Sequence, residues 1–159
     1  MVMAINEART APITEDLTTE DLSISVIRGL ESVFRKDIEL AAGATFAKGE
    51  WGVLDTEGKL ARPGASATAD AFVVFNGTDR FDVKATGKVT ILMGSFVAKT
   101  SKYDAGPSYA VNDYLTVRNL GGGEAILTKA ASGEPGVGRV LEVGNGYLVF
   151  EYIPAAVAP

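Results

Sequence analysis

Hydrophobic and polar residues alternate in short runs along most of this chain, and the runs recur about every ten residues. In KVTILMG, residues 88–94, Val89, Ile91 and Met93 alternate and fall on one face, with Thr90 and Leu92 on the other. A period of two residues is typical of a strand with one buried face. Since Gly, Asn or Asp bounds each run, the pattern predicts an all-β fold, either a small antiparallel β-barrel or a sandwich.

Neighbouring runs are expected to form hairpins, because short turn sequences separate them. The predicted turns are residues 55–58, 76–77, 86–87, 121–123 and 144–146. Asn-Gly, at 76–77, is a strong hairpin signal. No long helical pattern interrupts the strands, which argues against a parallel α/β sheet.

In the run ahead of the Thr86-Gly87 turn, residues 79–85, the apolar residues Phe81, Val83 and Ala85 alternate. We therefore predict that residues 79–94 are strand, turn and strand.

Residues 21–40 carry two competing patterns. Ile24 and Val26 alternate as in a strand, whereas the apolar residues of 30–38 also fit a helical stripe. Gly29 interrupts either element. We predict strands, with one helical turn within residues 29–36.

Three segments follow from the composition along the chain. Residues 1–20 are predicted to be an extended arm, residues 21–153 the β-domain and residues 154–159 a short extended tail. The arm is polar and lacks a strand period, so we expect it to become ordered on a partner; a frayed terminus is the alternative. Four spaced apolar residues are the predicted contacts of the arm with a partner: Met3, Ile5, Ile13 and Leu17.

The length and the charge of this chain limit the classes of protein to which it can belong. A chain of 159 residues with 47% hydrophobic and 22% charged residues predicts one domain with a packed core. The net charge of −5 disfavours nucleic-acid binding, since the one adjacent basic pair, Arg35-Lys36, precedes Asp37 and Glu39. The N-terminus lacks the pattern of a signal peptide, and no apolar run reaches the length of a membrane span, so no membrane partner is expected.

The absence of Cys and His removes thiolate and imidazole chemistry, and with them most catalytic and metal sites. Carboxylates are the remaining candidates for a glycosidase pair or a calcium site. These acids are Asp55, Glu57, Asp70, Asp79, Asp82 and Asp104. Several occupy turn positions where Asp caps its own backbone, and no calcium-loop motif is present. We therefore predict no enzyme, no cofactor and no metal.

Glycine and serine motifs give no stronger signal. In GEPGVGRVL, Gly136 and Gly138 are followed by Leu141 where a dinucleotide-binding turn needs a third glycine, so we expect turn glycines there. The serines of GAS (64–66) and GSF (94–96) lack the surroundings of a nucleophile elbow.

Aromatic residues lie mostly within strand patterns, and core packing accounts for most of them. Sugar or base stacking is the alternative, but no specific cluster favours it. The residues are Trp51, Phe72, Phe75, Phe81, Phe96, Tyr103, Tyr109, Tyr114, Tyr147, Phe150 and Tyr152.

Residues 38–152 resemble the capsid decoration (cement) proteins of tailed bacteriophages. The two longest matching stretches are residues 40–64 and 79–119. The matching motifs are Ala42-Gly43-Ala44, Lys48 to Trp51, Gly58-Lys59-Leu60, Gly87 to Thr90, Lys99-Thr100, Tyr103-Asp104, Asp113 to Val117 and Gly136 to Val140.

The resemblance implies a structural virion protein on the outer surface of the capsid that bridges subunits of the major capsid protein. It implies no catalytic residues. A homo-oligomer is expected, with a homotrimer favoured over a homodimer because capsid lattices offer three-fold sites. The alternatives are another phage structural module, from a tail, baseplate or fibre base, and a carbohydrate-binding or hydrolytic β-domain.

Overall fold

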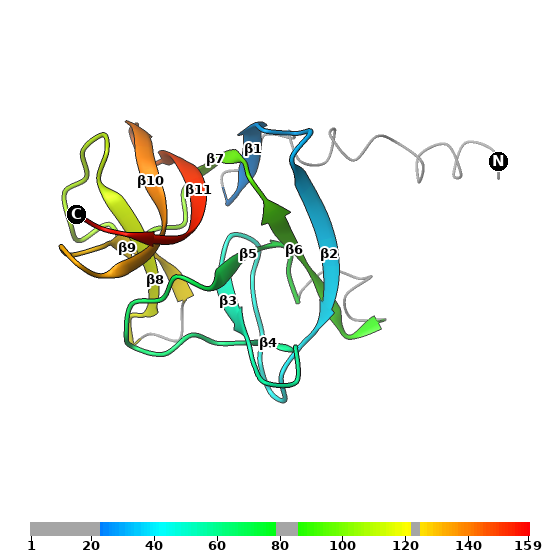
Figure 1. Cartoon of the computed structure of the whole chain (residues 1–159). Helices are drawn as coiled ribbons and strands as arrows, with labels where there is room; N and C mark the ends of the chain where they lie inside the picture. The colour runs from blue at the N-terminus through cyan, green and yellow to red at the C-terminus, as the bar shows by residue number, and fades with distance from the viewer. Residues whose placement is uncertain (1–22, 79–85, 122–124) are drawn as a thin grey trace, which may run out of the picture.

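The computed structural model describes residues 23–78, 86–121 and 125–159. Their backbone forms eleven strands in two sheets, and every pair of these strands is antiparallel (Figure 1). The strands are β1 (Ser25–Arg28), β2 (Val33–Glu39), β3 (Trp51–Leu54), β4 (Leu60–Ala61), β5 (Ala71–Asn76), β6 (Lys88–Gly94), β7 (Val97–Thr100), β8 (Tyr114–Asn119), β9 (Ala125–Lys129), β10 (Pro135–Val143) and β11 (Leu148–Val157). The predicted all-β class is confirmed.

The two sheets are open and face each other as a sandwich. One has six strands in the order β1-β7-β11-β10-β8-β9, and the other has five in the order β2-β6-β5-β3-β4. Neither sheet closes on itself, so of the two predicted architectures the sandwich fits and the closed barrel does not.

The chain passes from one sheet to the other at a corner where two crossings touch. One crossing leads from β1 to β2 through Gly29, and the other leads from β6 to β7 through Gly94. Both glycines have positive φ, 86° and 96°. A Cβ on Gly94 would overlap the carbonyl oxygen of Ser32, so the two crossings approach as closely as backbone allows.

The first crossing contains the single helical turn that the sequence predicted. The backbone N–H of Val33 donates to the carbonyl oxygen of Gly29 (3.0 Å), which closes one turn before β2 begins. The flanking segments are strands, as predicted.

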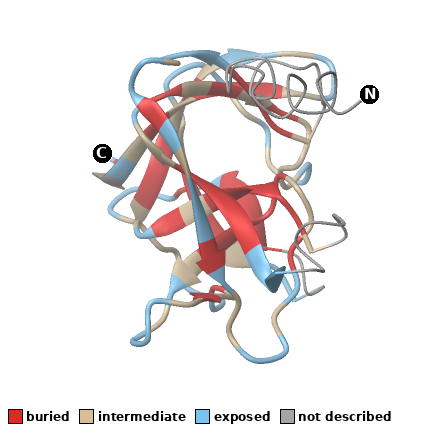
Figure 2. Ribbon diagram, turned by 90° about the vertical axis from the view of Figure 1, so that its right-hand side faces the viewer, coloured by how far each residue is buried: buried red, intermediate tan, exposed pale blue. Residues whose placement is uncertain are grey.

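The main core lies between the two sheets, where Figure 2 shows much of the buried backbone. Trp51 of β3 meets Phe150 and Tyr152 of β11, with ring centroids 6.0 and 5.9 Å apart. The Tyr152 hydroxyl also donates to the carbonyl oxygen of Ala71 in β5 (3.0 Å). One side chain therefore joins the sheets by both packing and a hydrogen bond.

A second core lies on the other face of the five-stranded sheet. The segment 40–50 folds over this face and places Phe46 against Leu60, Val74 and Ile91. Phe46 and Thr78 hold the segment by reciprocal bonds: Thr78 N–H donates to the Phe46 carbonyl (2.6 Å), and Phe46 N–H donates to Thr78 Oγ1 (2.7 Å). Each face of this sheet thus carries a buried core.

Most predicted hairpins are confirmed. Residues 55–58 join β3 to β4, residues 144–146 join β10 to β11, and strands flank the turn predicted at 121–123. Val89 and Ile91 are buried on one face of β6, as their alternation predicted. The strand predicted at 79–85, with Phe81, Val83 and Ala85, lies outside the described residues, as do Gly122 and Gly123.

The Asn76-Gly77 turn is not formed as predicted. Asn76 ends β5, is buried, and donates from its amide to Thr90 Oγ1 (3.4 Å). Gly77 packs against the carbonyl oxygen of Phe46, where a Cβ would lie only 2.6 Å away. Close packing, and not a positive φ, accounts for this glycine.

The segment predicted as a tail is part of β11, which continues to Val157. Two backbone bonds fasten its end, from Ala158 N–H to the Glu134 carbonyl (3.0 Å) and from Gly133 N–H to the Ala158 carbonyl (2.8 Å). Pro154 lacks an N–H, but β7 pairs with β11 only as far as Glu151. The proline therefore costs that pairing no hydrogen bond.

Candidate functional site

The four predicted contact residues of the arm, Met3, Ile5, Ile13 and Leu17, lie outside the described residues. The structure therefore places no partner contact there, and the search for a site rests on residues 23–78, 86–121 and 125–159.

Two of the candidate acids fix turns. Asp55 Oδ1 accepts hydrogen bonds from the backbone N–H groups of Glu57 and Lys59, each at 2.9 Å. Asp104 Oδ1 accepts from Gly106 N–H (3.0 Å), while its Oδ2 accepts from Thr128 Oγ1 (2.9 Å). These carboxylates satisfy the backbone, as the turn positions predicted.

The other candidate acids do not assemble a centre. Asp70 lies beside a surface groove, and Asp79 and Asp82 lie outside the described residues. Within the described part of the chain, no group of three or more acidic side chains is placed to hold a metal ion.

A buried carboxylate that sequence reasoning missed is Glu50, directly before β3. Its Oε1 accepts from Ala47 N–H (2.6 Å), and its Oε2 lies 3.4 Å from Arg62 Nη1. Arg62 also donates to the Thr45 carbonyl (2.5 Å). The signal in the sequence was an acid next to Trp51 at the start of an apolar run. The pair fastens the segment 40–50.

Two tyrosines have strongly raised pKa values. Burial, and then the nearby charge of Asp104, raises the pKa of Tyr109 to about 12. Burial, and then Asp70, raises the pKa of Tyr152 to about 12. Both phenols stay protonated at neutral pH, and both donate to backbone carbonyls, of Asp104 (2.5 Å) and Ala71. Their arrangement is structural.

The glycines expected to be turn glycines near residue 136 have another role. Gly136 and Gly138 lie inside β10, where a Cβ would come within 2.5 Å of the carbonyl oxygens of Leu115 and Glu151, respectively. They let neighbouring strands approach closely, and the prediction of turns at these two positions was wrong. Gly133, with a φ of 84°, does lie in a turn.

Aromatic residues belong to the core, as predicted. Trp51, Phe75, Phe96 and Phe150 are each at most 3% exposed. The ring of Phe96 stacks on that of Tyr152, with centroids 4.9 Å apart. Phe96 and Tyr152 line a surface groove, but they are only 3% and 4% exposed.

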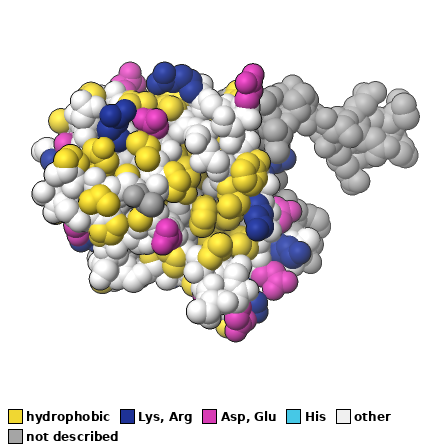
Figure 3. Space-filling model, viewed as in Figure 1, with side chains coloured by type: hydrophobic (Ala, Val, Ile, Leu, Met, Phe, Trp, Pro, Cys, Tyr) yellow, Lys and Arg dark blue, Asp and Glu magenta, His cyan; other side chains and the backbone are white. Residues whose placement is uncertain are grey.

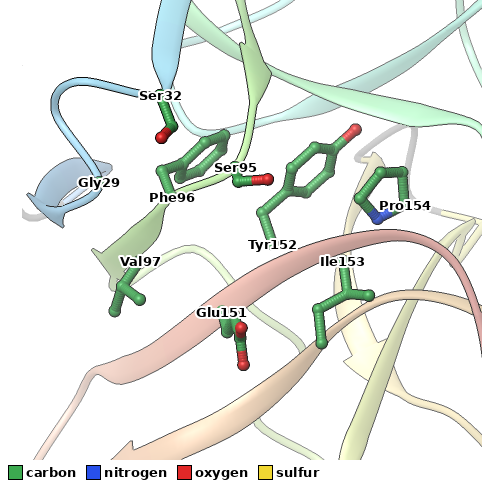
Figure 4. Close-up of a pocket in the computed structure, with 9 residues that line it drawn as sticks. All are labelled: Gly29, Ser32, Ser95, Phe96, Val97, Glu151, Tyr152, Ile153 and Pro154. Carbon is green, nitrogen blue, oxygen red and sulfur yellow. The ribbon is translucent and has the colours of Figure 1, made fainter.

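Two surface grooves among the described residues are further candidates. The first, at the corner where the chain crosses between sheets, has a volume of about 340 Å³ and is lined by Ser32, Ser95, Phe96 and residues 151–154 (Figure 4). Its one carboxylate, Glu151, lies 3.1 Å from Arg139. The groove thus offers no converging catalytic groups.

The second groove, of about 580 Å³, lies between β3 and the segment 63–70. Small residues of this segment form one wall, and Leu54, Asp70 and Phe72 contribute to the rest. This segment also crosses to the other sheet, where Asn119 N–H donates to the Gly64 carbonyl (2.8 Å). The segment 63–70 therefore connects the two sheets, and Asp70 is the one acidic residue that it brings to the groove.

Exposed apolar side chains are the other distinct surface feature. Hydrophobic groups gather in the middle of the face seen in Figure 3, and most charged groups lie toward its margins. The large exposed side chains among the described residues are Ile27, Phe34, Leu54, Val111, Leu120, Val143 and Val157. Contiguous apolar surface is typical of contacts between proteins, whereas single exposed apolar side chains are normal on any protein surface.

No helix among the described residues is long and apolar enough to cross a membrane. Comparisons with protein-family models, with curated proteins and with solved structures find no match to this chain.

Proposed function

We propose that the protein is a structural virion protein that decorates a phage capsid from outside and bridges subunits of the major capsid protein. The observation that carries this proposal is the resemblance of residues 38–152 to capsid decoration proteins. Its motifs are spread over both sheets: Lys48 to Trp51 leads into β3, Asp113 to Val117 into β8, and Gly136 to Val140 lies within β10.

The side-chain chemistry supports a role in assembly. Asp55 and Asp104 cap turns, Glu50 is paired with Arg62, and the buried aromatic residues fill the core. The described surface carries exposed apolar side chains and sheet edges, and both commonly form contacts between proteins.

Cryo-electron microscopy of particles that carry the protein tests the location. Density for the sandwich over the junctions between capsid subunits is the expected result. Density at a tail, baseplate or fibre base would replace the proposal with another phage structural module. A protein absent from particles would refute both.

We also propose that residues 1–20 tether the sandwich to the capsid. Spaced apolar residues such as Met3 and Ile13 can be buried on a neighbouring subunit, and several arms joined in one oligomer bind with avidity. A chain that begins at Thr19 is expected to keep its circular-dichroism spectrum and its oligomeric mass, while losing most of its retention on undecorated heads.

Two outcomes contradict the tether. If the shortened chain unfolds, the arm belongs to the core. If it decorates heads as tightly as the full chain, the arm has no role in attachment, although the sandwich could still decorate the capsid.

A further inference from the structure

The edge strand β2 is unusually long and regular for a strand whose outer edge meets no other described strand. Among the described strands only β6 pairs with it, through seven consecutive residue pairs from Val33–Gly94 to Glu39–Lys88 without a register shift. β2 runs along one flank of the molecule (Figure 1). The outer edge of such a strand presents backbone donors and acceptors to other strands.

The other three outer strands are shorter or interrupted. β4 has two residues, and β1 has four with a register shift against β7. β9 has five, and Tyr103 and Asp104 lie along it through a bridge and a hydrogen bond (2.7 Å) to Leu127. Among the described edges, β2 is therefore the one best shaped to accept a strand.

The side chains of β2 divide into two faces. Arg35 and Asp37 share one face and line a polar hollow of about 300 Å³ with Asn76 and Thr90. The opposite face carries Phe34, Lys36 and Ile38, paired with Met93, Ile91 and Val89, respectively. Phe34 is 53% exposed, which is high for a phenylalanine inside a strand.

This sequence is complementary to itself. If two copies pair antiparallel about a two-fold axis at Lys36, Arg35 lies opposite the partner's Asp37, and Phe34 lies opposite the partner's Ile38. Symmetry makes each of these pairs occur twice. Residues directly opposite one another point to the same side of a sheet, so the charges meet, and the exposed Phe34 lies at the margin of the partner's second core, to which Ile38 (6% exposed) belongs.

Neighbouring registers lack this match. With the axis at Arg35, the two arginines oppose each other and Val33 meets the partner's Asp37. With the axis at Asp37, Arg35 does meet the partner's Glu39, but the two aspartates oppose each other and Lys36 meets the partner's Ile38. Like charges directly opposite one another are unfavourable. The axis at Lys36 also opposes two lysines, but only there do both the ionic and the apolar pairs form.

We propose that two copies of this chain associate through β2, about a two-fold axis at Lys36, to form a dimer with one sheet continuous across both molecules. The proposal does not rest on the capsid function. It predicts a homodimer, whereas the three-fold sites of capsid lattices favoured a homotrimer. The masses of a dimer and a trimer are readily distinguished. The lysine pair at the axis makes the association reversible.

Light scattering on the full chain at micromolar concentration tests the proposal by charge exchange. The unchanged protein is expected to be a dimer, and Arg35→Asp or Asp37→Arg alone is expected to raise the dissociation constant about tenfold or more. The double variant Arg35→Asp/Asp37→Arg restores both ion pairs in reversed order and is expected to recover the dimer.

The matched control is Lys88→Asp. It changes the net charge as Arg35→Asp does and also places an acid opposite Glu39, but it lies on β6 away from the outer edge. It should leave the dimer unchanged. Circular dichroism and melting temperature accompany every variant, because both residues also interact within their own molecule: Arg35 has a partner there, and Asp37 accepts a hydrogen bond from Thr90 Oγ1 (2.8 Å).

A second measurement does not depend on the charge variants folding. The chain has no cysteine, so Lys36→Cys introduces a single thiol at the proposed axis. Opposed Cβ atoms in an antiparallel sheet are close to disulfide distance. Oxidised glutathione should convert Lys36→Cys into a covalent dimer, while Glu142→Cys, on the exposed end of β10, should remain unlinked.

The proposal is overturned by a monomeric or trimeric mass for the unchanged protein. It is also overturned by a dimer that persists in both single charge variants, or by Lys36→Cys cross-linking no faster than Glu142→Cys.

Discussion

At the scale of single residues, glycines mark where backbone meets backbone. Gly94 and Gly43 both have positive φ, at 96° and 74°. A Cβ on Gly43 would meet no atom within 4 Å, whereas one on Gly94 would overlap the Ser32 carbonyl. Substitutions at these two glycines therefore separate the free-energy cost of a side chain at positive φ from the cost of a steric clash.

Gly43→Ala is expected to destabilise the protein by about 1 kcal/mol, the cost of placing a side chain in the left-handed region. Gly94→Ala should cost at least about 3 kcal/mol, because the two crossings between the sheets must also separate. Urea unfolding of both variants measures the difference. Equal losses would show that the corner relaxes to admit a methyl group.

At the scale of elements, alternation in the sequence predicted strands well and their partners less well. Val89 and Ile91 in β6, and the turns at 55–58 and 144–146, were predictable because period and turn chemistry are local. Asn76-Gly77 also looked like a local turn, but packing against Phe46 and Thr90 overrides it.

The order of strands and the surface site could not be predicted, because they depend on distant contacts. β11 lies between β7 and β10, and nothing near residue 148 in the sequence indicates β7. The charges of Arg35, Lys36 and Asp37 were visible in the sequence, but their position on an outer edge was not. Pro154 suggested the end of the domain, and only the absence of a β7 partner beside it explains its place in β11.

The covering segment 40–50 is an element without regular strands, and its stability should depend on Phe46. Phe46→Ala removes a 2%-exposed ring from the second core and is expected to cost about 3–5 kcal/mol in unfolding free energy. Phe34→Ala, the same change at a 53%-exposed position, should cost less than about 1 kcal/mol when measured at a concentration where the protein is monomeric. Similar losses would contradict the assignment of Phe46 to a core.

At the scale of the whole molecule, Tyr152 joins the two sheets, and its contribution to the free energy of unfolding should depend on pH in the alkaline range. Its pKa is about 12 in the folded protein and about 10 when unfolded, so the unfolded chain loses the proton first. The stabilisation is fully present below pH 10 and is lost as the pH rises toward 12.

Tyr152→Phe removes both the hydrogen bond to Ala71 and this titration. The variant should be less stable than the unchanged protein by about 1 kcal/mol at pH 8, and the difference should shrink or reverse between pH 10 and 12. Urea unfolding of both proteins across this range cancels the titration of Tyr109, which the two proteins share. A constant difference would show that Tyr152 titrates alike in both states.

The place of β11 in the middle of the six-stranded sheet has a consequence for synthesis on the ribosome. Ten of the described strands emerge before residues 148–157, yet β7 and β10 meet only through β11. Until that segment is released, the nascent chain carries two strand edges inside its future interior, open to pairing with neighbouring nascent chains. This sheet therefore cannot be completed before residues 148–157 have left the ribosome, and folds rich in such distant pairings form in about milliseconds to seconds.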